Sequence, residues 1–297
     1  GINAILSPFK RFRTDFVGIE QGTYYCVTSA TKGGKSQFSS FMFIYAPLLY
    51  AYNHPEQVTV NIKYFPLEET PEGILHRFMS YLLYIYDKIE ISPADLRSTN
   101  NEKPIPENVL NLLDTPKYAN ILKYFEEHVE FSTNANPTGI FKECKLWAES
   151  TGKITTKTVT VKNDFGDLEK VEAFNYYTPN NPKEYKIIFL DHISLLHTEG
   201  GKNLRETIQK MSEYFVLLRN RYKMTPVVIQ QQAFFENVAA TQANLLKPEL
   251  VNLADCKYTA RDIDICLGLF SPYKHNLPMY MGYNITKFRD KIRFLEV

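Results

Sequence analysis

This chain of 297 residues has few of the sequence features that mark disulfide-rich, metal-binding, membrane or strongly basic proteins. Its four cysteines are widely spaced, with no Cys-x-x-Cys pair, and the six histidines show no metal-ligand spacing. This pattern argues against a disulfide scaffold and favours a reduced, cytoplasmic setting. No apolar run approaches the roughly 18–20 residues of a membrane span, and no signal peptide is visible. The formal net charge is only +1, so any nucleic-acid site must be a local patch.

What the chain does contain suffices for a large folded core. Hydrophobic residues make up 44% of the sequence, enough for one large α/β domain or two small ones. Strand-like and helix-like segments alternate, which predicts a parallel sheet flanked by helices on both faces. The chain begins with Gly rather than Met, and we expect that an N-terminal part has been lost.

A small-residue loop ending in Gly-Lys-Ser is the most informative motif. It follows a β-rich run that begins at Tyr24, and an apolar helical pattern follows from Phe38. The order strand, loop, helix is the context of a phosphate-binding loop. Lys35 is then expected to reach the β- and γ-phosphates, and Ser36 to ligate Mg²⁺. The first position of the motif is Ser29 instead of Gly, so a plain turn before a helix remains the alternative.

Several further elements follow from hydrophobic periodicity. Strands are expected over 58–65, 129–132, 186–191, 227–229, 263–270 and 279–288. Helices are expected over 71–86, 107–113, 118–127, 139–150 and 204–222. Between two core elements, residues 153–177 alternate polar and apolar around a turn at 163–167, which predicts an inserted β-hairpin. We expect a single domain over residues 1–297 that carries this hairpin on its surface.

Carboxylates and amides follow the predicted core strands. Asp191 ends an apolar strand, where a second Mg²⁺ ligand is expected if the phosphate loop is real; the alternative is a capping role. Glu68 and Glu69 follow the strand at 58–65, and at most one of them is expected to face the site as a general base. Gln232 ends a run of three glutamines after a buried strand and is a candidate sensor of the γ-phosphate.

Two cations end the predicted strand at 279–288. Lys287 and Arg289 share a face if the strand continues. They are suited to completing the nucleotide site of a neighbouring subunit as an arginine finger and its companion lysine. A solvated strand end is the alternative reading.

Taken together, these segments resemble the motor domain of replicative DnaB-type helicases, a ring-forming branch of the RecA-like ATPases. The resemblance runs from residue 1 to about residue 294, with residues 87–120 and 153–177 unmatched. It implies a RecA-like P-loop core with a mostly parallel sheet and a C-terminal antiparallel extension near 279–297. The implied nucleotide-binding residues are Ser29, Ala30, Thr31, Lys32, Gly33, Gly34, Lys35 and Ser36.

The same resemblance assigns roles within the site. It makes Glu68 rather than Glu69 the implied catalytic base, Gln232 the sensor, and Lys287 with Arg289 the elements that contact the adjacent subunit's nucleotide. Ser36 and Asp191 are the implied Mg²⁺ ligands. Residues 248–264 resemble the segment that holds single-stranded DNA, with substitutions that include Lys257. Lys257 and Lys202 are the candidates for phosphate contacts with DNA.

The sequence therefore predicts ATP hydrolysis, with ATP and Mg²⁺ as cofactors, coupled to movement along single-stranded DNA in replication. The resemblance implies a homo-hexamer, 5'-3' polarity, and a primase or loader bound through the missing N-terminal region. Two alternatives remain open at this point: a RecA-like ATPase that remodels or recombines DNA without unwinding it, and a degenerate P-loop scaffold that binds nucleotide or DNA.

Overall fold

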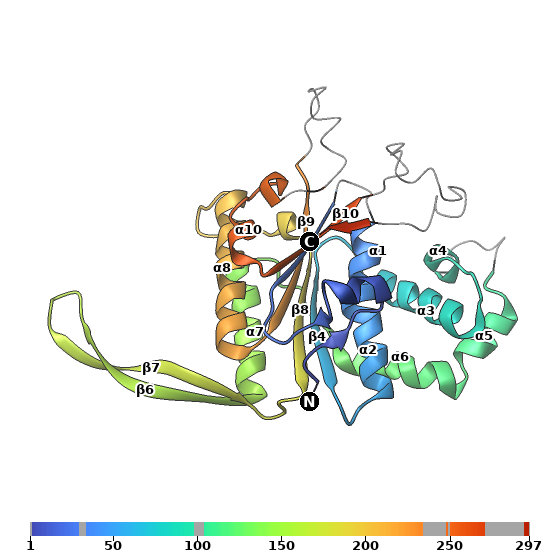
Figure 1. Cartoon of the computed structure of the whole chain (residues 1–297), viewed down its shortest axis with the longest axis horizontal. Coiled ribbons are helices and arrows are strands. Elements are labelled where there is room, and N and C mark those ends of the chain that lie inside the picture. Colours follow the sequence, from blue (N-terminus) through green and yellow to red (C-terminus); the bar gives the residue numbers. More distant parts are fainter. Residues whose placement is uncertain are drawn as a thin grey trace, which may run out of the picture.

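In the part of the chain that the structure describes, a seven-stranded sheet forms the centre (Figure 1). The computed structural model describes residues 2–29, 34–97, 104–233, 248, 250–270 and 294–296. In sheet order, the strands are β11 (Phe294–Glu296), β10 (Ile265–Phe270), β3 (Tyr25–Ser29), β9 (Thr225–Gln231), β8 (Glu184–Asp191), β4 (Thr59–Pro66) and β5 (Val129–Phe131). All neighbouring pairs are parallel except β11 with β10, which is antiparallel.

Helices cover both faces of this sheet (Figure 1). One face carries α1 (Lys35–Ser40), a π-helical turn (Phe41–Tyr45), α2 (Ala46–Asn53), α3 (Pro71–Asp87) and α6 (Pro116–His128). The shorter helices α4 (Pro93–Leu96) and α5 (Glu107–Leu113) lie beyond α3 and α6. The other face carries α7 (Pro137–Ser150) and α8 (Leu204–Tyr222), and α10 (Thr259–Asp262) lies beside α8. None of the helices in the described ranges combines the length and hydrophobicity that a bilayer crossing requires.

The central strands supply both hydrophobic cores because successive side chains of a strand point to opposite faces. In β8, Ile187 and Phe189 join the core beneath α1, α2 and α3. Ile188 and Leu190 join the second core, beneath α7 and α8. A strand buried on both faces reads as a continuous apolar run, which is how this segment appears in the sequence.

Local chemistry sets several helix boundaries. Prolines begin α3, α6 and α7, where the missing N–H has no intrahelical partner to lose. In α8 the Asn203 side chain accepts a hydrogen bond from the Glu206 N–H, and the Glu206 carboxylate accepts one from the Asn203 N–H. This reciprocal cap satisfies two N–H groups and defines the start of the helix.

Two small antiparallel sheets stand apart from the central one. The first pairs β1 (Ile5–Leu6) with β2 (Gly18–Ile19). The second pairs β6 (Gly152–Lys162) with β7 (Leu168–Pro179), a long hairpin that projects away from the body (Figure 1). The structure thus contains a hairpin at the position where the sequence predicts one.

The predicted fold class is confirmed: the sheet is mostly parallel, helices flank both faces, and an antiparallel strand lies at the C-terminal end. The strand expected over 279–288 lies outside the described residues. The four cysteines form no disulfide, and three of them are buried.

Candidate functional site

The Gly-Lys-Ser motif lies at the carboxyl edge of the parallel sheet. β3 ends at Ser29, and α1 begins at Lys35. Gly34 precedes the helix with φ = 89°, a backbone conformation that glycine adopts without strain. Ala30, Thr31, Lys32 and Gly33 lie outside the described residues. The carboxyl ends of parallel strands are the edge at which α/β proteins bind ligands.

Lys35 is nearly buried at this edge, with 8% of the residue exposed. Its Nζ donates to the Ser29 carbonyl oxygen at 3.3 Å and to the Ser29 Oγ at 3.4 Å. Burial lowers the pKa of the Lys35 ammonium, while the carboxylates of Asp191 and Glu68 act in the opposite direction. Ser29 is itself fully buried. The serine that departs from the motif is therefore accommodated in the strand and contacts the motif lysine.

Asp191 ends β8 with 2% of the residue exposed. Burial raises the pKa of its carboxyl group from 3.8 to about 7, and the nearby carboxylates of Glu68 and Glu69 contribute. Arg77 and a side-chain hydrogen bond with Ser36 act in the opposite direction. The two residues predicted to ligate Mg²⁺, Ser36 and Asp191, thus interact directly although they lie far apart in the sequence.

Glu68 and Glu69 are adjacent in the sequence but differ in their ion-pair partners. Strand pairing sets Pro66 opposite Asp191, and the Leu67 N–H donates to the Asp191 carbonyl at 2.9 Å. The next residue, Glu68, is exposed and affects the pKa values of both Lys35 and Asp191. Glu69 instead forms an ion pair with Arg77 of α3. Among the described residues Glu68 has no ion-pair partner, so its carboxylate is available to a ligand or a water molecule.

A buried carboxylate oxygen makes this site a candidate for cation binding. Asp191 Oδ1 is shielded from solvent and receives no hydrogen bond from any residue in the described ranges. An ionised carboxylate held in this state is unfavourable unless a cation or a proton compensates it. Together with the Ser36 hydroxyl, it forms an all-oxygen donor pair of the kind that Mg²⁺ prefers. Ser36 and Asp191 could therefore hold Mg²⁺, next to the Lys35 ammonium.

Gln232 lies beside the phosphate-loop strand. Its backbone N–H donates to the Ser29 carbonyl at 3.0 Å, and its Nε2 donates to the Thr28 Oγ1 at 2.9 Å. Two residues earlier, the buried Gln230 donates from Nε2 to the carbonyl oxygens of Ala254 at 2.6 Å and Cys256 at 3.0 Å. The end of β9 therefore bonds to the phosphate-loop strand on one side and to segment 252–257 on the other.

Other predicted site residues lie away from this cluster or outside the described ranges. Lys257 and Lys202 are both exposed. Lys257 is the last residue of segment 252–257, which Gln230 holds, whereas Lys202 lies in the loop before α8. Lys287 and Arg289 fall outside the described residues.

Sequence reasoning missed two residues of the site. Arg77 holds Glu69 and lowers the pKa of Asp191; an arginine in the second turn of a helix gives no local signal of such a role. His192 is one of the histidines without metal-ligand spacing in the sequence, yet it is buried next to Asp191. Its pKa is lowered by burial, and it senses the charges of Glu68 and Lys35. The sequence signal that could have identified His192 is its position directly after Asp191, a candidate metal ligand.

Comparison with protein-family models and with curated proteins finds no match for this sequence. Among solved structures, the chain is similar to a DnaB-like replicative helicase that was described with its interactions with primase. The identity is 12% and the TM-score is 0.58, over 93% of this chain and 54% of that one. The chain thus spans about half the length of that helicase. It is also similar to a second solved structure, that of an ATPase domain, with 11% identity and a TM-score of 0.57 over 94% of this chain and 80% of that one.

These similarities confirm the resemblance at the level of the fold. The chain has the fold of the ATPase domains of DnaB-like replicative helicases.

Proposed function

We propose that this protein is an ATP-dependent motor that translocates on single-stranded DNA and unwinds duplex DNA in replication. The observation that carries the proposal is the convergence of Lys35, Ser36, Asp191 and Glu68 at one sheet edge. These residues follow three different strands and form the set of groups that phosphoryl transfer requires.

In this proposal each side chain has one task. Lys35 binds the β- and γ-phosphates, and Ser36 and Asp191 hold Mg²⁺, which supplies charge neutralisation at the phosphates when bound. Glu68 accepts the proton of the attacking water, a role open to an exposed carboxylate that pairs with no cation among the described residues. Glu69 has no such role, because Arg77 already holds its carboxylate.

The coupling of hydrolysis to DNA is assigned to the end of β9. Loss of the γ-phosphate changes the surroundings of Gln232, which is bonded to the phosphate-loop strand. Movement of β9 then reaches segment 252–257 through the two hydrogen bonds of Gln230. We propose that Lys257, the last residue of this segment, and Lys202 contact DNA phosphates. Such contacts are independent of sequence and sensitive to salt.

We also propose that a neighbouring subunit completes the nucleotide site. Lys287 and Arg289 would act on the nucleotide of an adjacent copy in a homo-hexamer, as the resemblance implies. An Arg289→Ala variant is then expected to assemble and bind nucleotide but to lose turnover. Full turnover by assembled Arg289→Ala rings would exclude this role.

Strand displacement tests the function directly. A forked DNA duplex with single-stranded tails of each polarity is incubated with the protein, Mg²⁺ and ATP. We expect displacement that depends on ATP and is abolished in Lys35→Ala. ATP turnover that single-stranded DNA stimulates, without displacement on either fork, would instead support a DNA-remodelling ATPase and refute the helicase assignment.

A further inference from the structure

The hairpin formed by β6 and β7 is a long arm with a fixed base. β6 contains 11 residues, which corresponds to an extended length of about 35 Å. At the base, the buried Tyr177 donates its hydroxyl to the Ala148 carbonyl at 3.0 Å and packs against Tyr222. Arg221 lies over the ring of Phe174. These contacts with α7 and α8 set the direction in which the arm leaves the body (Figure 1).

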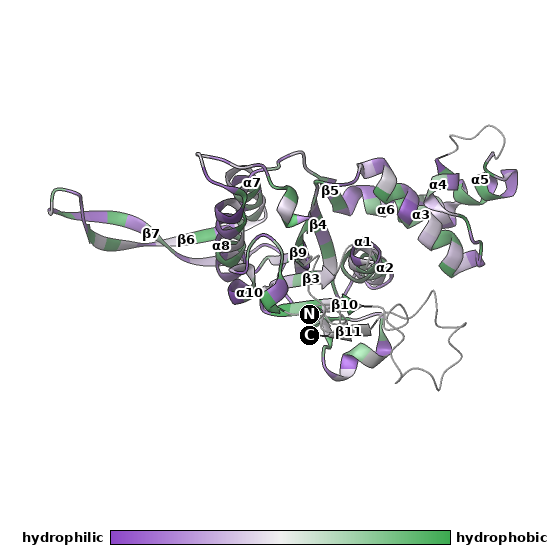
Figure 2. Ribbon diagram, turned by 90° about the horizontal axis from the view of Figure 1, so that it is seen from above, coloured by the Kyte–Doolittle hydropathy of each residue, from purple (hydrophilic) through white to green (hydrophobic). Residues whose placement is uncertain are grey.

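One face of the distal half of the arm has an apolar centre. Val159 pairs with Val171 there, and on either side Val161 lies opposite Glu169 and Ala173 lies opposite Lys157. Figure 2 shows this apolar stretch between hydrophilic ones along the arm. An isolated two-stranded hairpin is only marginally stable in water. A surface that covers this face would therefore stabilise the arm.

The turn at the tip of the arm holds an exposed aromatic side chain. Asn163 Oδ1 accepts hydrogen bonds from the N–H groups of Phe165 and Asp167, at 3.0 and 2.9 Å. Gly166 adopts φ = 89° and completes the turn. Phe165 is 91% exposed, and the nearby Leu168 is 73% exposed. A large apolar side chain on an ordered turn is the kind of group that anchors a protein interface.

The charge of the arm favours a protein partner over a nucleic acid. Residues 153–178 contain four lysines, no arginine and four carboxylates, so the formal charge of this segment is zero. A surface that binds the phosphate backbone is instead positively charged.

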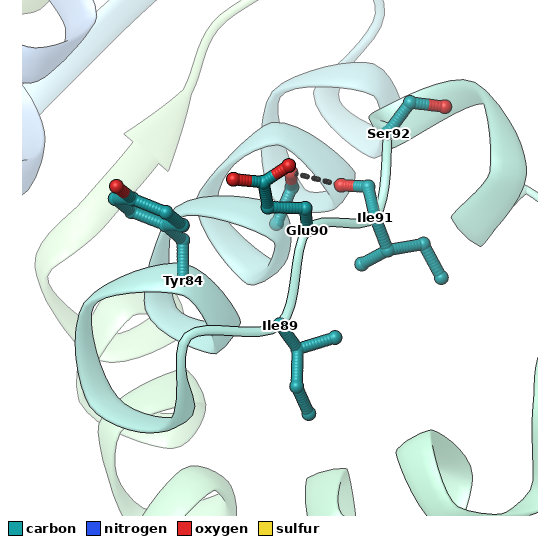
Figure 3. A pocket seen from close by; sticks show the side chains of 6 residues that line it. Tyr84, Ile89, Glu90, Ile91 and Ser92 are labelled. Atoms are coloured by element: carbon teal, nitrogen blue, oxygen red, sulfur yellow. Dashed lines mark hydrogen bonds between the residues drawn. The ribbon is translucent and has the colours of Figure 1, made fainter.

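A pocket with apolar and polar lining residues lies at the opposite end of the molecule (Figure 1). It lies between the end of α3 and the start of α4, has a volume of about 580 Å³, and is lined by Ser80, Tyr84, Ile89, Glu90, Ile91 and Ser92 (Figure 3). The Ser80 hydroxyl donates to the Ile91 carbonyl at 2.5 Å and so fixes the segment that forms one wall. Glu90 is the charged residue of this lining, and Lys162 flanks the tip of the arm.

We propose that the arm of one copy of this chain inserts Phe165 into the pocket of a second copy. The arm points away from its own body and the pocket lies on the far side (Figure 1), so the contact joins two molecules. Tip and pocket are different surfaces, which makes the interface head-to-tail and able to extend into a ring or a filament. The proposal does not depend on ATP hydrolysis and goes beyond the function proposed above.

Sedimentation velocity of nucleotide-free protein tests this contact. Phe165→Asp is expected to weaken self-association by about 30-fold or more, since it places a charge where the aromatic ring would be buried in the proposed interface. Leu146→Asp is the matched control, because Leu146 is 64% exposed on α7 and away from both surfaces. Unchanged melting temperatures show that both variants are folded. A monomeric wild-type protein, or equal association of wild type and Phe165→Asp, would overturn the proposal.

A mixing experiment tests the head-to-tail geometry. Phe165→Asp retains an intact pocket, and Tyr84→Asp retains an intact tip. Each variant alone is expected to be monomeric, whereas an equimolar mixture forms heterodimers through the one intact pair of surfaces. A mixture that stays monomeric, or a Tyr84→Asp variant that associates like the wild type, overturns the assignment of the pocket. Wild-type association of Phe165→Asp with loss of single-stranded DNA binding would identify nucleic acid as the partner instead.

Discussion

Replacing Asp191 with asparagine is expected to stabilise the nucleotide-free protein at neutral and alkaline pH. Burial raises the pKa of this carboxyl group from 3.8 to about 7 in the folded state. The folded protein thus binds a proton more tightly than the unfolded chain does. This tighter proton binding adds to the free energy of unfolding. The contribution is fully present below pH 3.8 and is lost as the pH rises through about 7. Above this pH the wild type holds a buried negative charge, which asparagine removes.

The size of the effect follows from the same pKa values. The difference between 3.8 and about 7 corresponds to roughly 4 kcal/mol in the free energy of unfolding. The asparagine amide adds two N–H groups that need acceptors, which offsets part of this gain. We therefore expect Asp191→Asn to be more stable than the wild type by about 1–3 kcal/mol at pH 8.

Urea unfolding between pH 5 and pH 8 measures this difference. The gain from Asp191→Asn is expected to be largest at pH 8 and to shrink toward pH 5, where the wild-type carboxyl group is protonated. The matched control is Asp164→Asn, which changes an exposed aspartate at the tip of the arm and should shift stability little at any pH. A variant that is equally or less stable than the wild type at pH 8 would refute the reasoning.

The remaining predictions concern catalysis and DNA. Glu68→Gln is expected to lower ATP turnover by about 100-fold or more while MgATP binding persists, whereas Glu69→Gln chiefly lowers the melting temperature because Arg77 loses its partner. Gln232→Ala is expected to keep basal turnover and lose stimulation by single-stranded DNA, as a titration with DNA would show. Lys257→Ala is expected to weaken DNA binding at all sequences and to reduce the slope of log affinity against log salt by about 1; an unchanged slope would remove Lys257 from the DNA site.

The sequence predicts the core well because its signals are local. The residues of α5 and α8 match the predicted ranges. For α8 the reason is a capping box at its start and an apolar stripe along its length. The starts of α6 and α7 are two residues earlier than predicted. In both cases a proline opens the helix, and it extends the helix beyond the periodic pattern. The elements β1, β2 and α4 are too short to show any period.

The site could be predicted only in part, because its geometry depends on strand order. Residue types identify Lys35 and Asp191 as candidates, but parallel strands bring them together. Residue types leave the choice between the two glutamates open, and the resemblance implies Glu68. The ion pair of Glu69 with Arg77 supports that proposal, and it depends on a tertiary contact. The hydrogen bonds of Gln230 to the 252–257 segment depend likewise on tertiary contacts that no local pattern encodes.

The central claim is that Lys35, Ser36, Asp191 and Glu68 form a working MgATP site that responds to DNA. The most direct measurement is the steady-state rate of ATP hydrolysis with and without single-stranded DNA, for the wild type and for Lys35→Ala. We expect turnover that DNA stimulates and that Lys35→Ala abolishes. Absence of turnover in every oligomeric state of the wild type, or equal turnover in Lys35→Ala, would contradict it.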